Sequence, residues 1–291
     1  MPIVALACGH VTLDRVDGRL APGGSVYYAA NAYRALGARA RALTAAGPDF
    51  PAATALQGIE VHAVPARETT RFVNAYLPGG RRVQRVEAVA QPLDPSTLPL
   101  GWREADLLHI APVLGEIRPR DILRLGRARV VGLSVQGLVR AVGPDGAVVQ
   151  PRWEIGPGDL AGVDAALLGE DDLVGQGDLV AHLADAVPIV VLTHGARGCE
   201  VISRGRTQRV GVHAAREVDP TGAGDVFAAG FLLGLARGMA PLEAARLGAG
   251  AASVIVEAPA GEALGRVAEG WRRSEDVPVY GDLPDPGTSS A

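Results

Sequence analysis

Short apolar runs recur along the chain, and most are separated by segments long enough to form a helix. The runs cover residues 3–9, 40–46, 107–111, 130–134, 165–168 and 189–193, and the helix-length segments include 25–36, 118–126 and 178–186. A strand buried on both faces has a continuous apolar run, and helices that connect such strands make them parallel. The sequence therefore predicts an α/β fold, with a mostly parallel sheet and helices on both faces.

Two segments depart from this alternation. Residues 71–77 and 81–89 alternate polar and apolar side chains around Pro78-Gly79-Gly80, which predicts a β-hairpin. Residues 274–291 are rich in Pro, Gly, Asp and Ser, which is typical of a loose C-terminal tail. We therefore expect one domain over residues 1–273.

Composition excludes several classes of protein. No apolar run reaches the roughly 18 residues that a membrane span needs, and the net charge is −4 with scattered basic residues. The start of the chain runs directly into a strand-like segment, and there are only two cysteines, Cys8 and Cys199. We expect a cytoplasmic protein with no disulfide, no membrane association and no nucleic-acid partner.

The chain contains no lysine, so all 28 basic residues are arginines. A Walker-type phosphate loop, a Schiff-base site and the strand lysine of protein kinases each need a lysine amine. All three are excluded. If this chain binds ATP, backbone groups and arginines must hold the phosphates instead.

The most informative stretch is Val218-Asp219-Pro220-Thr221-Gly222-Ala223-Gly224-Asp225, which precedes a helical apolar pattern over 226–235. It predicts a helix whose first turn carries small residues. Unpaired N–H groups and the positive end of the helix dipole make such a turn an anion site. Asp225 would then accept a proton from an attacking hydroxyl while the glycine amides stabilise a phosphoryl group. A plain glycine turn, with Asp225 pairing with the helix dipole, explains the same residues.

Residues 219–231 resemble the signature of the ribokinase (PfkB-type) family of carbohydrate kinases, Asp-Thr-Thr-Gly-Ala-Gly-Asp followed by an aromatic residue and a glycine. The resemblance implies a ribokinase-like fold and transfer of the terminal phosphoryl group of ATP to a hydroxyl. It makes Asp225 the catalytic base and Gly222, Ala223 and Gly224 the anion hole. Asp219 and Thr221 lie where some members bind a monovalent cation such as K⁺.

The resemblance extends to the N-terminal third. Gly9-His10-Val11-Thr12-Leu13-Asp14 resembles the first strand of the family, which leads to an aspartate that holds substrate hydroxyls, and Gly23-Gly24 resembles its diglycine motif. Sugar kinases of the family carry a β lid over the site. Here only eight residues separate Asp14 from Gly23, so we expect a reduced lid built from residues 12–22 and 68–90. A small lid makes either a monomer or a dimer compatible with the sequence.

Residues 190–198 resemble the nucleotide loop of the family. Thr193, Gly195 and Gly198 would then bind ATP together with Thr221, Gly222 and Gly224. The helix 242–256, which borders the adenine in the family, has Ala249-Gly250-Ala251-Ala252 in place of polar anchors. We therefore expect loose selectivity for the nucleotide base.

The Asn-x-x-Glu motif of the family, which organises Mg²⁺ through water, falls near residues 168–172. Glycine replaces its asparagine, Asp172 best matches its glutamate, and Glu170 lies close by. These two carboxylates are the expected magnesium site. A solvated acidic loop is the alternative.

The acceptor is expected to be a small polyol or sugar. Asp14, Asn74, Gln136 and Arg140 offer the donors and acceptors that pair with several hydroxyls, and the Gln-Gly-x-x-Arg segment over 136–140 resembles inositol kinases more than ribokinase. Aromatic residues make up only 4% of the chain, which disfavours stacking on a base. A nucleoside kinase of the same family, or a non-catalytic protein that binds a sugar or nucleotide, remains an alternative.

Overall fold

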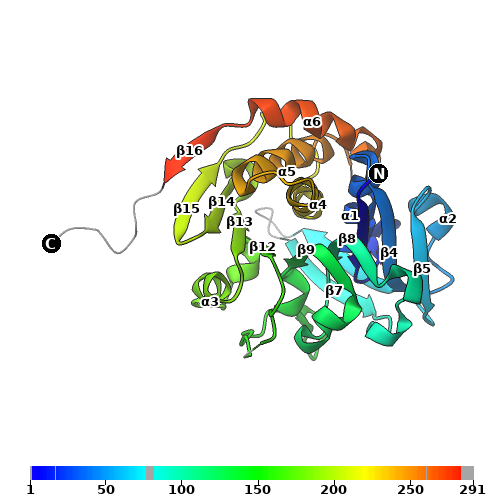
Figure 1. Ribbon diagram of the computed structural model, residues 1–291. Coiled ribbons are helices and arrows are strands. Elements are labelled where there is room, and N and C mark those ends of the chain that lie inside the picture. Colours follow the sequence, from blue (N-terminus) through cyan, green and yellow to red (C-terminus); the bar gives the residue numbers. More distant parts are fainter. Residues whose placement is uncertain (1, 17, 77–81, 157, 260, 283–291) are drawn as a thin grey trace.

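The computed structural model describes residues 2–16, 18–76, 82–156, 158–259 and 261–282 (Figure 1). Its main sheet contains β1 (Val4–Cys8), β4 (Arg39–Ala46), β5 (Glu60–Pro65), β8 (Glu104–Ile110), β9 (Arg127–Ser134), β12 (Ala165–Gly169), β13 (Ile189–Thr193), β14 (Cys199–Ser203), β15 (Arg206–Val210) and β16 (Val279–Asp282). The strand order is β16-β15-β14-β13-β12-β9-β8-β1-β4-β5. Pairing is parallel from β5 to β13 and antiparallel from β13 to β16. The mostly parallel α/β sheet is thus confirmed.

One face of this sheet is covered by α1 (Ser25–Ala35), α4 (Ala223–Ala236) and α5 (Pro241–Ile255), with η7 (Glu262–Glu269), α6 (Gly270–Arg273) and η8 (Ser274–Asp276) outside them (Figure 1). Helix α4 is buried along most of its length, which explains why its sequence is apolar on all sides. Small residues let it approach its neighbours. A Cβ on Gly132 of β9 would lie 2.3 Å from the Leu232 side chain of α4.

The other face is covered by α3 (Leu179–Ala186) and by short 3₁₀ turns, η1 (Pro95–Thr97), η2 (Leu100–Trp102) and η3 (Pro119–Leu125); α2 (Ala52–Ala55) lies beside the edge strand β5. The segment 118–126 forms a 3₁₀ helix instead of the expected α-helix. Its Asp121 is buried and accepts hydrogen bonds from Arg118 and Arg124, and Gly126 ends it with φ 134°. The Asp121 N–H donates to the Arg118 carbonyl three residues back at 2.9 Å, which is the 3₁₀ hydrogen-bond spacing.

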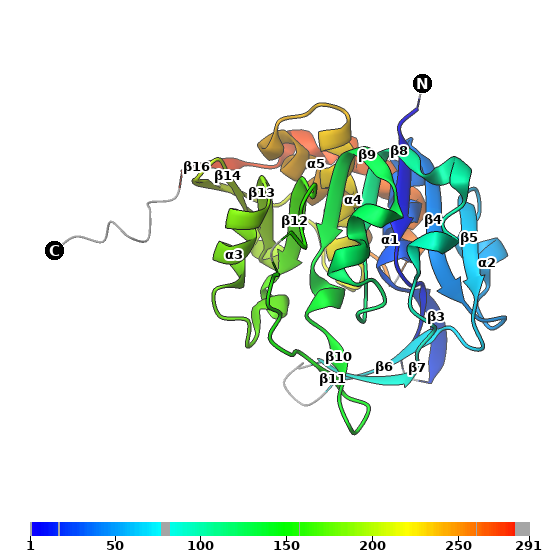
Figure 2. The same cartoon turned by 60° about the horizontal axis from the view of Figure 1, so that its bottom comes forward.

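A second, four-stranded sheet forms the lid, from β2 (Thr12–Val16), β3 (Arg19–Gly23), β6 (Thr70–Tyr76) and β7 (Arg82–Ala88). The β6–β7 hairpin is confirmed, although its Pro78-Gly79-Gly80 turn lies outside the described residues. Residues 12–23 add a second hairpin, and β2 pairs with β6 in parallel. The small hairpin of β10 (Ala141–Val142) and β11 (Val148–Val149) reaches β7 through a bridge between Arg85 and Ala147. Figure 2 shows the lid across the end of the sheet opposite the N-terminus.

The domain extends beyond residue 273, where we expected a loose tail to begin. Residues 274–276 form η8, and Val279–Asp282 pairs with β15 as the last strand of the sheet. A four-residue edge strand between prolines carries too weak a pattern to stand out from the Pro- and Gly-rich composition around it. Only residues 283–291 of the expected tail lie outside the described part of the chain.

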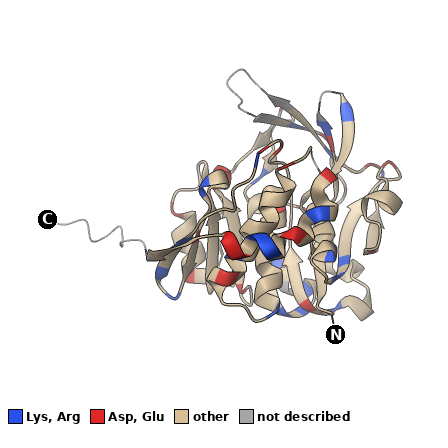
Figure 3. Cartoon of the chain, turned by 90° about the horizontal axis from the view of Figure 1, so that it is seen from above, with Lys and Arg blue, Asp and Glu red and all other residues tan. Residues whose placement is uncertain are grey.

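Within the described ranges, no helix is long and apolar enough to cross a membrane. Figure 3 shows acidic and basic residues interspersed over the helices and strands in view.

Candidate active site

The start of α4 is built by a tight turn. Asp219 Oδ1 accepts the Thr221 N–H at 2.9 Å, and the Ala223 N–H donates to the Pro220 carbonyl at 3.0 Å. Gly222 is the N-cap, with φ 82°, a conformation that favours glycine. The first N–H groups of the helix therefore emerge at the carboxyl end of the parallel strands, where ligands bind in open α/β sheets.

The structure explains the glycines at positions 222 and 224 in different ways. A Cβ on Gly222 would lie 2.3 Å from the Tyr28 ring, so this glycine is required by packing as well as by its φ. A Cβ on Gly224 would meet no described heavy atom within 4 Å, and this residue is exposed in the first turn of α4. Of these two glycines, only Gly224 therefore has open space in front of its backbone.

Asp225 is half-buried beside the start of α1. Desolvation raises the pKa of its carboxyl to about 6, against the opposing effects of a hydrogen bond from Ser25 and the charge of Arg140. The carboxylates of Asp172 and Asp14 raise that pKa further. The structure therefore brings two acidic residues and one arginine from distant parts of the sequence close to this carboxyl group.

Asp14 lies on β2 against the diglycine. Thr12 Oγ1 donates to Asp14 Oδ1 at 2.9 Å, and a Cβ on Gly23 would lie 2.6 Å from Asp14 Oδ2. Gly24 is the N-cap of α1 with φ 89°, and a Cβ there would lie 2.7 Å from the His10 carbonyl. Both glycines are needed because the lid strand and the start of α1 approach each other closely.

Asn74 lies on the lid strand beside Asp14. In the parallel pairing of β2 with β6, Asp14 stands opposite Phe72, so strand alternation puts Phe72 and Asn74 on the same face as Asp14. The Asn74 side-chain oxygen accepts a hydrogen bond from Gln84 at 2.9 Å. Its orientation is therefore held by the neighbouring strand.

Gln136, Arg140 and Asp172 meet at the ends of two adjacent strands, in and after η4 (Gln136–Leu138) and in η5 (Glu170–Leu173). Arg140 Nη2 lies 4.0 Å from Asp172 Oδ1, and Asp172 Oδ2 accepts the Gly169 N–H at 2.9 Å. Burial raises the pKa of Asp172, although the Gly169 N–H, Arg140 and Gln136 oppose the shift. Among the described residues, Asp172 Oδ1 is buried without a hydrogen-bond partner.

The two carboxylates expected to organise magnesium differ in how they are engaged. Glu170 pairs with His194 Nδ1 at 2.7 Å and with Arg197, and both lower its pKa. Two basic partners already engage its oxygens. Asp172 Oδ1 has no hydrogen-bond partner among the described residues, although Arg140 Nη2 lies 4.0 Å away, so it can accept a hydrogen bond from a metal-bound water. No three His, Cys, Asp or Glu side chains within the described ranges gather as direct metal ligands.

The expected nucleotide loop follows β13 and contains η6 (Gly195–Arg197). Thr193 Oγ1 donates to the Leu168 carbonyl of the neighbouring strand at 3.3 Å. Gly195 has φ 56° and nothing within 4 Å of a Cβ, whereas a Cβ on Gly198 would lie 2.1 Å from the Val210 carbonyl. Gly195 therefore has open space in front of it, and Gly198 has a purely structural reason to be glycine.

The small residues at 249–252 also have a structural reason. A Cβ on Gly250 would lie 2.6 Å from the Gly270 carbonyl, and a Cβ on Gly270 would lie 2.7 Å from Ala251 Cα. Helix α6 thus packs directly against α5 at these positions. Packing against α6 thus sets the size of Gly250 and Ala251, and loose selectivity for the nucleotide base stays a prediction.

Sequence reasoning missed two residues of this site, Ser25 and Tyr28. They are three positions apart, on one face of α1, directly after the diglycine. Both are buried, Ser25 against Asp225 and Tyr28 against Gly222. Their position at the start of a helix that follows the diglycine is the one sequence feature that could have indicated them. A buried tyrosine alone is more typical of a core.

A buried network anchors the lid to the main sheet. Glu116 accepts the N–H groups of His10, Val113 and Leu114 at 2.8–3.0 Å. The His10 ring lies 2.9 Å from Thr70 Oγ1 and 3.0 Å from the Gln91 carbonyl. The network therefore joins the entry to β2 with both ends of the β6–β7 hairpin.

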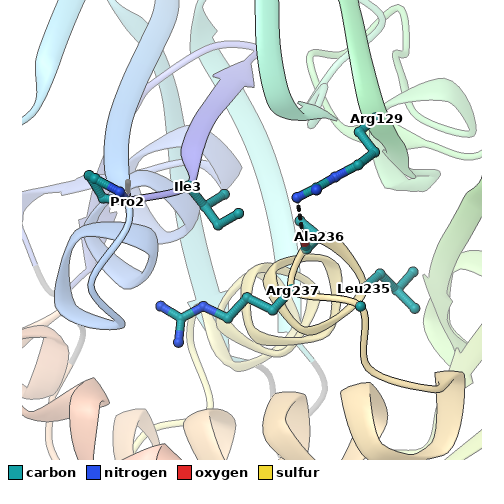
Figure 4. A pocket seen from close by; sticks show the side chains of 7 residues that line it. Pro2, Ile3, Arg129, Leu235, Ala236 and Arg237 are labelled. Atoms are coloured by element: carbon teal, nitrogen blue, oxygen red, sulfur yellow. Dashed lines mark hydrogen bonds between the residues drawn. The ribbon is translucent and has the colours of Figure 1, made fainter.

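A hollow of about 500 Å³ lies at the opposite end of the parallel strands, lined by Pro2, Ile3, Arg129, Leu235, Ala236, Arg237 and Gly238 (Figure 4). Arg129 donates there to the Ala236 carbonyl at the end of α4. Asp225 lies in the first turn of the same helix, about 16 Å from Ala236 at a rise of 1.5 Å per residue. This hollow is therefore separate from the carboxylates described above.

Comparisons with known proteins point to one family. Residues 165–263 match the pfkB family carbohydrate kinases. Over 276 residues the chain is 33% identical to an inositol 3-kinase from Oryza sativa subsp. japonica, which covers 84% of this chain and 65% of that protein. It is 27% identical over 263 residues to a cytidine kinase from Thermococcus kodakarensis, covering 82% of this chain and 91% of that protein. The chain spans less than two thirds of the length of the plant inositol 3-kinases that it matches.

A solved structure extends the similarity to the whole fold. A pyrophosphate-dependent kinase in the ribokinase family, complexed with a pyrophosphate analog and myo-inositol, superposes with a TM-score of 0.74 at 25% identity. The match covers 89% of this chain and 96% of that chain.

Proposed function

This chain belongs to the PfkB family of carbohydrate kinases, and on that premise we propose that it transfers the terminal phosphoryl group of ATP to a hydroxyl of a small polyol. The observation that carries the proposal is the position of Asp225 in the first turn of α4, one residue after the unobstructed Gly224. A base and an anion site are there combined in one helical turn.

In the proposed reaction, Asp225 accepts the proton of the attacking hydroxyl. A pKa of about 6 keeps its carboxyl mostly deprotonated at neutral pH and still basic enough to take a proton. The acceptor oxygen forms a bond to the terminal phosphorus, and the bond from that phosphorus to the bridging oxygen breaks. The backbone amides around Ala223 and Gly224 stabilise charge on the transferring group.

Asp172 and, at longer range, Glu170 are proposed to hold Mg²⁺ through water. The ion, when bound, neutralises charge on the donor phosphates. Asp172 has a buried oxygen, Oδ1, without a hydrogen-bond partner among the described residues, whereas Glu170 is engaged with His194 and Arg197. Asp219 and Thr221 are proposed for a monovalent cation such as K⁺, and Thr193 and Gly195 for the donor nucleotide. Two free, buried cysteines, Cys8 and Cys199, support a cytoplasmic location.

For the acceptor we propose a cyclitol, with myo-inositol as the first candidate. Asp14, Asn74, Gln136 and Arg140 are polar groups suited to several hydroxyls, and the similarity to the rice inositol 3-kinase supports this choice. A panel of myo-inositol, ribose, adenosine and cytidine at equal concentration tests it. We expect myo-inositol to give the highest kcat/KM. A clear preference for cytidine or adenosine would favour a nucleoside kinase, which the similarity to the cytidine kinase raises as the second candidate.

Pyrophosphate is the alternative donor, because a similar structure that spans nearly the whole chain is a pyrophosphate-dependent kinase. The same assay run with ATP, GTP and pyrophosphate separates the two donors. Activity with ATP alone supports the proposal, and activity with pyrophosphate alone changes the donor while keeping the acceptor chemistry. Binding of polyol or nucleotide without transfer from any donor would instead favour a non-catalytic binding protein.

A further inference from the structure

Tyr28 carries a buried hydroxyl that the proposed reaction does not yet use. Its side chain is 2% exposed, and its oxygen has no hydrogen-bond partner within the described chain. A buried hydroxyl without a partner costs free energy, so such groups are rare in native structures. The cost is recovered if a ligand supplies the missing partner.

The charged groups around this hydroxyl indicate that it faces the proposed acceptor site. Burial raises the pKa of Tyr28, and so do the negative charges of Asp14, Asp225 and Asp219. The phenol therefore stays protonated and can donate a hydrogen bond. Asp14 and Asp225 are the groups proposed to hold and deprotonate the acceptor, and both accept hydrogen bonds as carboxylates.

The ring of Tyr28 performs a different task from its hydroxyl. It packs on Gly222, where a Cβ would lie 2.3 Å from the nearest ring carbon, and it meets the Tyr27 ring edge-on at 5.0 Å. The ring thus supports the left-handed turn at the start of α4. Because the ring alone makes these contacts, the two tasks can be separated by removing one oxygen atom.

From this arrangement we propose that Tyr28 determines acceptor specificity, by donating a hydrogen bond from its hydroxyl to an acceptor hydroxyl lying between Asp14 and Asp225. The inference rests on the proposed function and names a binding group for it. A polyol presents several adjacent hydroxyls, so it can pair with the phenol and the two carboxylates together. An acceptor that lacks the matching hydroxyl leaves the phenol unpaired and is discriminated against.

Tyr28→Phe tests the proposal, with Tyr33→Phe as a matched control on the same helix. Tyr33 is also buried, but its hydroxyl lies 3.1 Å from His109 Nδ1 and therefore already has a hydrogen-bond partner. We expect Tyr28→Phe to raise the KM for myo-inositol at least about tenfold and to leave the donor KM unchanged. The melting temperature should stay the same or rise, because the variant lacks the buried hydroxyl. Tyr33→Phe should lower the melting temperature by about 2 °C and leave the myo-inositol KM unchanged.

The outcomes are distinguishable. If the wild-type chain phosphorylates myo-inositol and Tyr28→Phe does so with the same KM, the inference is wrong and the proposed function stands. If Tyr28→Phe lowers stability and raises both KM values, the hydroxyl is structural, which also overturns the inference. Absence of transfer from either donor to any polyol by the wild-type chain overturns the proposed function itself.

Discussion

At the scale of single residues, the site combines groups that a stable core would avoid. Asp225 is held where desolvation and two neighbouring carboxylates raise its pKa to about 6, and Tyr28 keeps a buried hydroxyl without a described partner. Such features are typical of functional sites, where stability is given up for chemistry. The helix start at Gly222–Asp225 could be predicted from sequence, because small residues followed by an apolar helical pattern mark it, whereas the role of Asp225 as base stays a prediction. Tyr28 could not, since nothing local distinguishes it from a core tyrosine.

Asp225→Asn should separate the catalytic role of Asp225 from its effect on stability. We expect kcat to fall at least about 100-fold, because the variant has no group to accept the proton, while donor binding persists. The folded-state pKa of about 6 lies above the ordinary 3.8, so wild-type stability falls as pH rises through that window. The variant should therefore be more stable than wild type at pH 8, by at most roughly 3 kcal/mol. The difference should vanish below pH about 4.

Kinetics and thermal unfolding across pH 4–8 provide the measurements for this prediction. Near-normal turnover in the folded variant would remove Asp225 from the role of base. Equal stability of the two proteins at every pH would show that the carboxyl is better solvated than its surroundings suggest.

Gly224→Val and Gly222→Ala should fail in different ways. Gly224 is helical with open space in front of it, and valine has a higher helix propensity than glycine, so the substitution should leave stability nearly unchanged while obstructing the donor phosphates. We expect a folded variant with a large rise in donor KM. Gly222→Ala forces a side chain into the Tyr28 ring at positive φ and should lower the melting temperature by several degrees. A fully active Gly224→Val would show that this glycine serves only the turn.

At the scale of elements, the lid is the part where sequence reasoning was least complete. The β6–β7 hairpin has a clear alternating pattern, but the β2–β3 hairpin is short and begins in the same residues that hold Asp14 and the diglycine. Its pairing with β6 is parallel and depends on contacts across more than 55 residues of sequence, from Thr12↔Thr70 onward. No local pattern can reveal such a register, because it is set by tertiary packing.

The Glu116 network should control how the lid is held. Glu116→Gln preserves size but replaces one carboxylate oxygen with an NH2 group that cannot accept, so either the His10 or the Leu114 N–H loses its acceptor. We expect the free energy of unfolding to fall by about 1–3 kcal/mol and the acceptor KM to rise, because β2 carries Asp14. Glu243→Gln, at an exposed helix start, is the control and should change neither quantity appreciably. Thermal unfolding and acceptor titrations measure both; an unaffected Glu116→Gln would mean that the network does not hold the lid.

At the scale of the whole molecule, the mostly parallel character of the sheet was predicted from the alternating apolar runs, but the order of its strands was not. Seven parallel strands alternate with helical or turn segments, and the residues predicted to bind ligands lie around their carboxyl ends, as expected for an open α/β sheet. The three strands added beyond β13 are antiparallel. None of these three strands was predicted, and the last carries too little hydrophobic periodicity in four residues to be distinguished from a polar tail.

Strand β16 also determines which strand forms this edge of the sheet. It covers the free edge of β15, whose N–H and C=O groups would otherwise be available to a strand from another chain. A chain ending at residue 273 should therefore lose solubility and form concentration-dependent aggregates, whereas one ending at residue 282 should stay dispersed. Light scattering against concentration compares the two. The C-terminal segment, distant from the chemistry, would then be what keeps this protein from self-association through its sheet edge.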